Sequence, residues 1–192
     1  MQYNIPAVLF AGGQSSRMGK DKTLLPFSGY RSLSEFQYVR LGKLFKTVYI
    51  SAKNDKFDFQ ANIIKDLYEV ASPLVGIISV FESLEADEVF ILSADAPFVD
   101  KKVIDMLMHN RKDHDAVIAR TESGKQPLCG IYKRSVLPVA QENFKAEDHR
   151  IGNLLNRVDT KFVFFEDDAV FSNLNHPHEY EEAVKRITKE KD

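Results

Sequence analysis

The sequence has too little cysteine for several kinds of protein. Cys129 is the single cysteine among 192 residues, so no disulfide can form within the chain. A structural zinc site built on cysteines is disfavoured for the same reason. Such sparse use of cysteine is typical of a reducing compartment.

Long apolar runs and an excess of positive charge are also missing. The apolar runs fall well short of the roughly 18 residues typical of a membrane span. The N-terminus, Met1-Gln2-Tyr3-Asn4, has no basic region, and we expect no signal peptide. The net charge is −2, so no overall positive field favours nucleic acid or an anionic membrane. We therefore expect a soluble cytoplasmic protein that binds neither nucleic acid nor membranes.

What is present is the composition of an ordinary globular domain. Hydrophobic residues make up 44% of the chain and charged residues 28%, which argues against a disordered protein. The length is close to that of one domain of about 150 residues. We find no internal repeat and no linker rich in proline, glycine or serine. We expect residues 1–192 to form a single domain.

Patterns typical of strands and of helices alternate along most of the chain. The apolar or β-branched runs that predict strands are residues 7–10, 47–52, 62–65, 88–94, 115–119, 128–133 and 161–166. The amphipathic stretches that predict helices are residues 32–45, 73–84, 100–110, 134–144, 150–158 and 177–189. This order predicts an α/β fold, a three-layer sandwich with a mostly parallel sheet and a Rossmann-like nucleotide-binding half. Ligands bind such sheets beyond the carboxyl ends of the strands, here after Phe10, Ala52, Lys65, Ala94 and Ala119.

A glycine-rich loop follows the first expected strand. Gly12 and Gly13 let the backbone approach a ligand closely, and successive N–H groups in such a loop can bind an anion. Arg17, Lys20 and Lys22 add three cations within six residues, which suits a triphosphate. The loop matches neither the P-loop nor the dinucleotide-binding pattern. The alternative is a flexible loop with surface lysines.

The same loop carries a resemblance to a known family. Leu9-Phe10-Ala11-Gly12-Gly13, Ser16-Arg17-Met18-Gly19 and Asp21-Lys22 resemble the L-A-G-G-x-S-x-R-M-G-x-D-K signature of nucleotidyltransferases. Asp21-Lys22 is most similar to the molybdenum cofactor guanylyltransferase (MobA) family, since the related methylerythritol cytidylyltransferases usually carry Pro-Lys there. The resemblance implies a nucleotide-diphospho-sugar transferase-like fold. It also implies nucleotide contacts from Phe10, Ala11, Gly12, Gly13 and Lys22, with Arg17 and Lys22 catalytic.

Two further segments resemble the nucleotide-binding part of that family. Asp66, followed by Ser72-Pro73-Leu74-Val75-Gly76-Ile77, is similar to a D-(x)n-G-P-L-A-G-I element. The resemblance implies that Asp66, Pro73 and Gly76 bind the nucleotide, with Asp66 on the guanosine. The family also has an asparagine after the second strand; here Lys53 stands in that place and Asn54 comes one residue later. We take Asn54 as the nucleotide contact. Asp66 as a solvated strand end and Pro73 as a first-turn residue remain the alternatives.

Asp95 follows the most apolar strand of the chain. Magnesium prefers oxygen ligands and typically takes one or two carboxylates together with substrate phosphates. A carboxylate at the tip of a buried strand is rigidly placed for that role. Ser93-Ala94-Asp95-Ala96-Pro97-Phe98 also resembles the C-D-x-P-[FL] element of the family. We expect Asp95 to be catalytic, to bind the nucleotide and to hold Mg²⁺; the alternative is a turn or capping residue.

Two segments are similar to the family's acceptor side. Gln126-Pro127 resembles an [HQ]-P element near the second substrate. Asn173-Leu174-Asn175-His176-Pro177-His178-Glu179 resembles an N-x-N-T-P-E-D ending. The resemblance implies acceptor or metal contacts from Gln126, Asn173 and Asn175. His176 and His178 replace Thr and Glu, which leaves the capping of the last helix open.

The expected reaction transfers GMP from GTP to the terminal phosphate of a molybdopterin cofactor and releases pyrophosphate. The resemblance implies Mg²⁺ as cofactor and GTP and the molybdopterin cofactor as partners, with molybdoenzymes or cofactor-delivery proteins as further possible partners. Two alternatives stay open. One is a cytidylyltransferase of the same fold acting on molybdopterin or a sugar alcohol phosphate. The other is a catalytically silent nucleotide-binding or cofactor-delivery protein.

Overall fold

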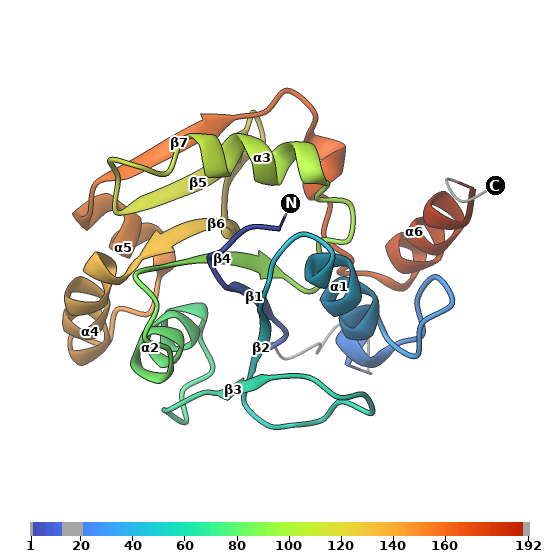
Figure 1. Ribbon diagram of the computed structural model, residues 1–192, viewed down its shortest axis with the longest axis horizontal. Helices are drawn as coiled ribbons and strands as arrows, with labels where there is room; N and C mark the ends of the chain where they lie inside the picture. The colour runs from blue at the N-terminus through green and yellow to red at the C-terminus, as the bar shows by residue number, and fades with distance from the viewer. Residues whose placement is uncertain (1, 13–20, 190–192) are drawn as a thin grey trace.

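Seven strands form one sheet in the part of the chain that the structure describes (Figure 1). A computed structural model describes residues 2–12 and 21–189, apart from the side chains of residues 188 and 189. The sheet order is β3-β2-β1-β4-β6-β5-β7. The strands are β1 Ala7–Phe10, β2 Val48–Ala52, β3 Ile63–Lys65, β4 Glu88–Ser93, β5 Ala116–Thr121, β6 Gly124–Lys133 and β7 Thr160–Phe164. Only β6 runs antiparallel to its neighbours in this sheet of described residues, so the predicted mostly parallel sheet is confirmed.

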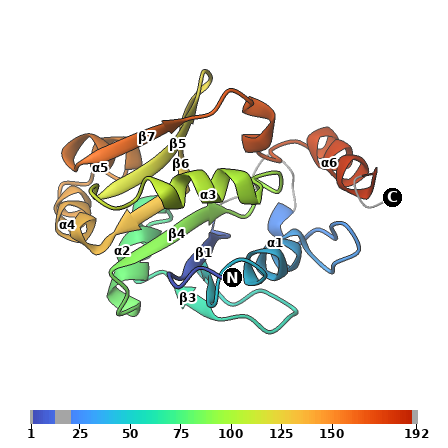
Figure 2. The same cartoon turned by 45° about the horizontal axis from the view of Figure 1, so that its top comes forward.

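Helices cover both faces of the sheet and make three layers (Figure 1). One face carries α1 Leu33–Gly42 and α3 Lys101–His109, and the other carries α2 Pro73–Ser83, α4 Leu137–Lys145 and α5 Ile151–Arg157. The last helix, α6 Pro177–Lys189, lies beside α1 at one end of the molecule (Figure 2). The described residues also form three short 3-10 turns: η1 Lys22–Leu24, η2 Arg134–Val136 and η3 Asp168–Phe171.

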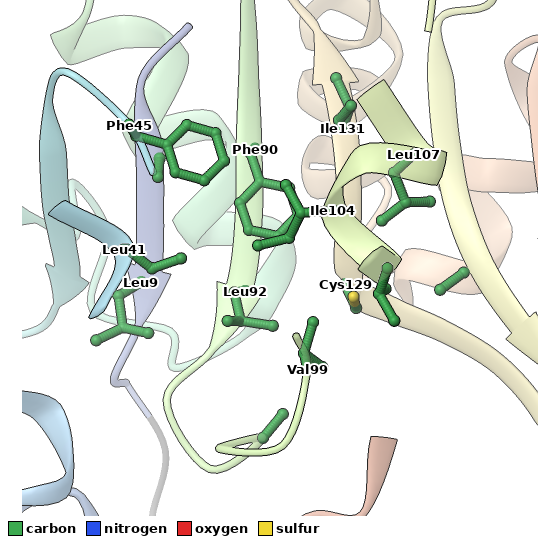
Figure 3. Packing of buried hydrophobic residues seen from close by; sticks show 14 of the residues in the cluster. Leu9, Leu41, Phe45, Phe90, Leu92, Val99, Ile104, Leu107, Cys129 and Ile131 are labelled. Atoms are coloured by element: carbon green, nitrogen blue, oxygen red, sulfur yellow. The ribbon is translucent and has the colours of Figure 1, made fainter. Parts of the chain in front are cut away.

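The central strands are apolar because both of their faces are covered. Along β1, Ala7 and Leu9 pack toward α1 and α3, whereas Val8 and Phe10 pack toward α2. Figure 3 shows Leu9 and Leu92 side by side in the first of these layers, with Phe90 beside Phe45. The Phe45 and Phe90 rings are stacked, with centroids 5.2 Å apart. This packing fixes the backbone at the point where β1 and β4 end.

The chain reverses its direction of travel across the sheet between β1 and β4. From β1 it moves outward to β2 and β3, then returns to place β4 on the other side of β1. Phe10 is in register with both Ser51 of β2 and Ser93 of β4. Open α/β sheets bind ligands in the crevice outside such a reversal point.

The second half of the sheet differs from the prediction mainly where β5 ends and β6 begins. β6 begins at Gly124, four residues before the expected start, and β5 extends to Thr121. The first residues of β6 are polar, so no apolar pattern predicts a strand there. They are extended because they pair with the backbone of β5. Pro127 cannot donate a ladder hydrogen bond, and it lies where the β5–β6 register shifts between Ile118 and Ala119.

The helices otherwise lie close to their expected ranges, with shifts at their ends. The expected helix 32–45 ends at Gly42, and the expected helix 134–144 begins as η2 and becomes α4 at Leu137. Among the described residues, no helix is long and apolar enough to cross a membrane. The expectation of a single domain stays a prediction.

Candidate active site

The loops that follow β1 and β4 begin side by side. The Ala94 N–H donates to the Phe10 carbonyl at 2.9 Å, and the Ala11 N–H donates to the Ser51 carbonyl at 3.0 Å. The loop that contains Gly12 and the turn that contains Asp95 therefore leave the sheet from neighbouring strands. Both lie at the reversal point between β1 and β4.

Three polar side chains from distant parts of the chain meet beyond these strand ends. The Lys22 ammonium donates to Asp95 Oδ2 at 2.5 Å and to Asn175 Oδ1 at 2.8 Å. The Lys22 and Asp95 side chains are each 15% exposed. Ser93 Oγ donates to the other carboxylate oxygen of Asp95 at 2.5 Å. We call Lys22, Asp95 and Asn175 the polar triad.

The segment before α6 is tied directly to the Asp95 turn. The Leu174 N–H donates to the Asp95 carbonyl at 3.0 Å, and Leu174 is buried. This contact places Asn175 next to Asp95. Glu179 then accepts from the N–H groups of Asn175 and His176, at 2.6 and 2.8 Å, so the open question of how the helix is capped has an answer in this glutamate.

Lys22 is held in place by the residue that precedes it. Asp21 caps η1, accepting from the Thr23 N–H at 3.0 Å and from Thr23 Oγ1 at 2.6 Å. Lys56 forms an ion pair with Asp21 and also donates to the Ala11 carbonyl at 3.0 Å. Burial raises the pKa of Asp21, but the hydrogen bonds from Lys56 and Thr23 and the charge of Lys56 outweigh it and hold this pKa below its usual value.

A second carboxylate, Asp66, faces the glycine loop from the end of β3. A side-chain carbon at Gly12 would lie 3.9 Å from Asp66 Oδ2. Burial raises the pKa of Asp66, against the charge of Lys53 and a hydrogen bond from Ser51. Lys53 also pairs with Glu69 at 2.9 Å and so joins the loops after β2 and β3. Asp66 is therefore a partly buried carboxylate beside Gly12 at the ends of the strands.

The first turn of α2 packs very closely on the end of β1. Ser72 caps the helix by accepting from the Val75 N–H at 3.2 Å, and Pro73 occupies the first turn. Gly76 is buried against the Phe10 ring: a Cβ there would lie 2.7 Å from Phe10 Cε2. The glycine thus lets α2 approach the strand ends.

The remaining expected site residues fall into two groups. Gly13 and Arg17 lie outside the described residues. Asn54 and Asn173 are described and exposed, and it is Lys53 rather than Asn54 that faces the Asp66 loop. Gln126 lies within β6 in register with Ala119. Because β6 is antiparallel, its beginning lies at the edge where β4 ends.

Sequence reasoning missed several residues that hold the site together. Lys56, Ser51 and Ser93 contact Asp21, Asp66 and Asp95, respectively. Ser93 is the first residue of the segment that resembles the family element, and its place two positions before Asp95 is the signal that could have found it. Lys56 carries no such signal, because its partner lies 35 positions away in the chain.

The donor set fits a hard divalent cation that is shared with phosphates. Asp95 and Asn175 present oxygen atoms, and a cation, the Lys22 ammonium, already joins them. Within residues 2–12 and 21–189, no three His, Cys, Asp or Glu side chains gather into a metal-binding group. An ion here would depend on one carboxylate together with ligand oxygens, as magnesium does in phosphate-transfer sites.

This arrangement is suited to a ligand that carries several negative charges. Lys22 supplies a cation, Asp95 can hold a metal ion, and the Gly12 backbone allows close approach. No activated nucleophile is needed for a transfer between phosphates, because positioning and charge stabilisation do most of the work.

Comparison with known proteins gives a consistent result. A family model described as a MobA-like NTP transferase domain matches residues 7–161. The protein named molybdenum cofactor guanylyltransferase from Campylobacter jejuni strain RM1221 is 39% identical over 191 residues, covering 97% of this chain and 100% of that one.

Solved structures share the fold at lower identity. Molybdopterin-guanine dinucleotide biosynthesis protein A from Archaeoglobus fulgidus has a TM-score of 0.83 at 20% identity, covering 96% of this chain and 100% of that one. The 2-C-methyl-D-erythritol 4-phosphate cytidylyltransferase from Thermus thermophilus has a TM-score of 0.72 at 13% identity, covering 97% and 100%. The fold is therefore shared by proteins whose names refer to different nucleotides, and it does not by itself select the base.

Proposed function

Because the chain belongs to the MobA-like NTP transferase family, we propose that it transfers GMP from GTP to the terminal phosphate of a molybdopterin cofactor. The product is the guanine dinucleotide form of the cofactor. An oxygen of the acceptor's phosphate attacks the α-phosphorus of GTP, the bond between the α-phosphorus and its bridging oxygen breaks, and pyrophosphate leaves. One phosphoanhydride bond is lost and one is formed, so the step needs no oxidant or reductant.

The polar triad is the observation that carries this proposal. Lys22, Asp95 and Asn175 converge at the strand ends although they come from the start, the middle and the end of the chain. Lys22, with Arg17 from the same loop, neutralises charge that develops on the phosphates. Asp95 holds Mg²⁺, which when bound polarises phosphate oxygens. We assign phosphate contacts to the backbone of Phe10, Ala11 and Gly12, and to Gly13 from the sequence pattern alone.

The base lies between the glycine loop and the start of α2. Asp66 accepts from the N1–H and the N2 amine of guanine, since a partly buried carboxylate needs donors to compensate its loss of water. An adenine or cytosine edge would present an acceptor at this position and leave the carboxylate badly paired. Asn54, Pro73 and Gly76 complete the nucleotide side.

The acceptor lies on the other side of the polar triad. Asn175 already contacts Lys22, and Gln126 lies at the same edge of the sheet at the start of β6. We assign Gln126, Asn173 and Asn175 to the acceptor's phosphate and pterin.

We place the protein in a reducing compartment such as the cytoplasm, because its one cysteine is buried and unpaired.

Thermal stabilisation by each of the four nucleoside triphosphates tests the choice of base. A ligand that binds only the folded chain stabilises it by about 2.7 kcal/mol at one hundred times its Kd, or roughly 5–10 °C in Tm for a chain of this size. We expect GTP with Mg²⁺ to give the largest shift. A larger shift with CTP at equal concentration would favour the cytidylyltransferase alternative. Pyrophosphate release excludes a silent binding protein.

A further inference from the structure

A buried glutamine on α1 contacts the turn that carries Asp95. Gln37 is fully buried, and its amide group donates to the Ala96 carbonyl at 3.0 Å and to the Ala94 carbonyl at 3.4 Å. These are the carbonyls on either side of Asp95. The Asp95 carbonyl itself accepts from the Leu174 N–H at 3.0 Å. Three successive carbonyls of the turn are therefore each bound by a distant part of the chain.

A second side chain of α1 extends the same contact. Arg40, one turn after Gln37, donates to the Val99 carbonyl at 2.5 Å. Val99 lies just before Asp100, which caps α3. The two side chains thus hold both ends of the segment that joins β4 to α3.

The burial of Gln37 has no explanation within α1 itself. Of the other buried positions of the helix, Leu33, Phe36 and Leu41 are apolar, and Ser34 is a small polar residue. The Oε1 atom of Gln37 is buried and has no hydrogen-bond partner among the described residues. A buried amide that is only half satisfied costs stability. What it supplies in return is two N–H donors from one nitrogen, which no apolar side chain and no carboxylate can offer to a pair of carbonyls.

We propose that Gln37 is a positioning residue that fixes the Asp95 carboxylate for the metal-bound nucleotide, assisted by Arg40. This inference rests on the proposed function, in which Asp95 holds Mg²⁺. The Ala94 and Ala96 carbonyls are tied to Gln37 on α1 and the Asp95 carbonyl is tied to Leu174, while the Asp95 side chain extends to Lys22 and Ser93. Without the two donors, the turn would relax to satisfy its carbonyls elsewhere, and the carboxylate would move. A displacement of about 1 Å in such a site can cost about a hundredfold in rate.

The test compares Gln37→Met with Leu41→Ala on the same helix. Methionine has nearly the volume of glutamine and no donor, whereas Leu41→Ala removes a fully buried side chain that is not part of the turn contact. The readout is the GTP dissociation constant with Mg²⁺ and with EDTA, measured by calorimetry. We expect the dissociation constant of Gln37→Met for GTP to rise about tenfold in the presence of Mg²⁺. In EDTA, its dissociation constant should equal that of the parent. Leu41→Ala lowers the Tm and leaves both affinities as in the parent.

Asp95→Asn, alone and combined with Gln37→Met, separates the two proposals. If Gln37 acts through Asp95, the double variant binds Mg²⁺-GTP no worse than Asp95→Asn alone. Parental Mg²⁺ dependence in Gln37→Met, with Asp95→Asn impaired, overturns the positioning role and leaves the proposed function standing. Parental Mg²⁺ dependence in Asp95→Asn overturns the metal site and the positioning role with it. If Gln37→Met does not fold, Gln37→Asn, which keeps the amide but withdraws it by one methylene, must show the same loss or the inference fails.

Discussion

Lys22 Nζ lies 2.5 Å from Asp95 Oδ2, although 73 positions separate the two residues in the chain. The pair brings the cation of the glycine loop to the carboxylate of the β4 turn. In the free protein each compensates the charge of the other, and Asn175 Oδ1 accepts a further hydrogen bond from the same ammonium. In the function proposed here, a metal-bound triphosphate would give both groups new partners, Lys22 on phosphate oxygens and Asp95 on the metal.

Replacing Lys22 by alanine is expected to lower turnover far more than stability. Loss of one charge-assisted contact to the transition state typically costs about 10²–10³ in kcat. The Lys22 side chain is not part of an apolar cluster, so the Tm should change by only a few degrees. Steady-state pyrophosphate release together with a melting curve checks both values. Lys102→Ala, an exposed lysine on α3, is the matched control. Near-parental turnover in Lys22→Ala would remove the glycine loop from the triphosphate site; Arg17→Ala tests the same loop from a residue that only the sequence locates.

The ion pair between Lys56 and Asp21 should make stability depend on acid. The pKa of Asp21 is held below 3.8 by Lys56 and Thr23 against the effect of burial. A lowered carboxyl pKa stabilises the fold above the unfolded value and loses this contribution as the pH falls through the folded value. Lys56→Met should therefore cost about 1 kcal/mol near pH 6, the scale of a partly screened ion pair.

That deficit should shrink once the pH falls below about 4, because protonated Asp21 no longer gains from Lys56 in the parent. Urea unfolding of the parent and Lys56→Met between pH 3.5 and 6 measures the difference, with Lys102→Met as the control for loss of an exposed charge. A deficit that is constant over this range would show that Lys56 acts by packing alone. Lys56→Met should also weaken GTP binding, since Lys56 joins Asp21 to the Ala11 carbonyl.

Gly76→Ala is expected to destabilise the protein although the site is helical. Alanine normally stabilises a helix relative to glycine by about 1 kcal/mol. Here the new Cβ would lie 2.7 Å from Phe10 Cε2 and 3.3 Å from Ser51 Oγ. Overpacking of this kind costs about 1–3 kcal/mol. In Gly152→Ala on α5 the new Cβ meets no described atom within 4 Å apart from its chain neighbours and the backbone of its own helix, so this control should be neutral or slightly stabilising. Equal effects of the two substitutions in chemical denaturation would refute close packing at Gly76.

Residue patterns predict much of the fold in the first half of the chain, because each segment there has the composition that its place in the fold requires. Ala7–Phe10 and residues 89–92 are entirely apolar, and only a strand covered on both faces needs that composition. Pro73 at the first turn marks the start of α2 correctly. The early start of β6 could not be found this way, since Gly124, Lys125 and Gln126 owe their extended form to pairing with β5 rather than to an apolar pattern.

The residues of the candidate site likewise fall into those that a sequence pattern predicts and those that only the tertiary structure identifies. Lys22, Asp95 and Asn175 were found because each lies in a segment with a family pattern, and the structure brings them together. Gln37 and Lys56 were not, because nothing in the neighbouring residues announces a buried amide or a cation that contacts a loop far along the chain. A residue that positions a backbone segment far away in the chain can be identified only from the tertiary structure. A single sequence gives no local pattern for it.

Pyrophosphate release by Asp95→Asn tests the central claim most directly. Asparagine keeps the shape of the side chain and serves nearly as well in turns and caps, so the Tm of the free protein should stay within a few degrees of the parent. The substitution removes the carboxylate that we propose holds Mg²⁺, and release of pyrophosphate from GTP in the presence of the molybdopterin acceptor should fall by at least about a hundredfold. We expect this loss at both saturating and limiting Mg²⁺. Parental turnover of Asp95→Asn at both concentrations would contradict the account.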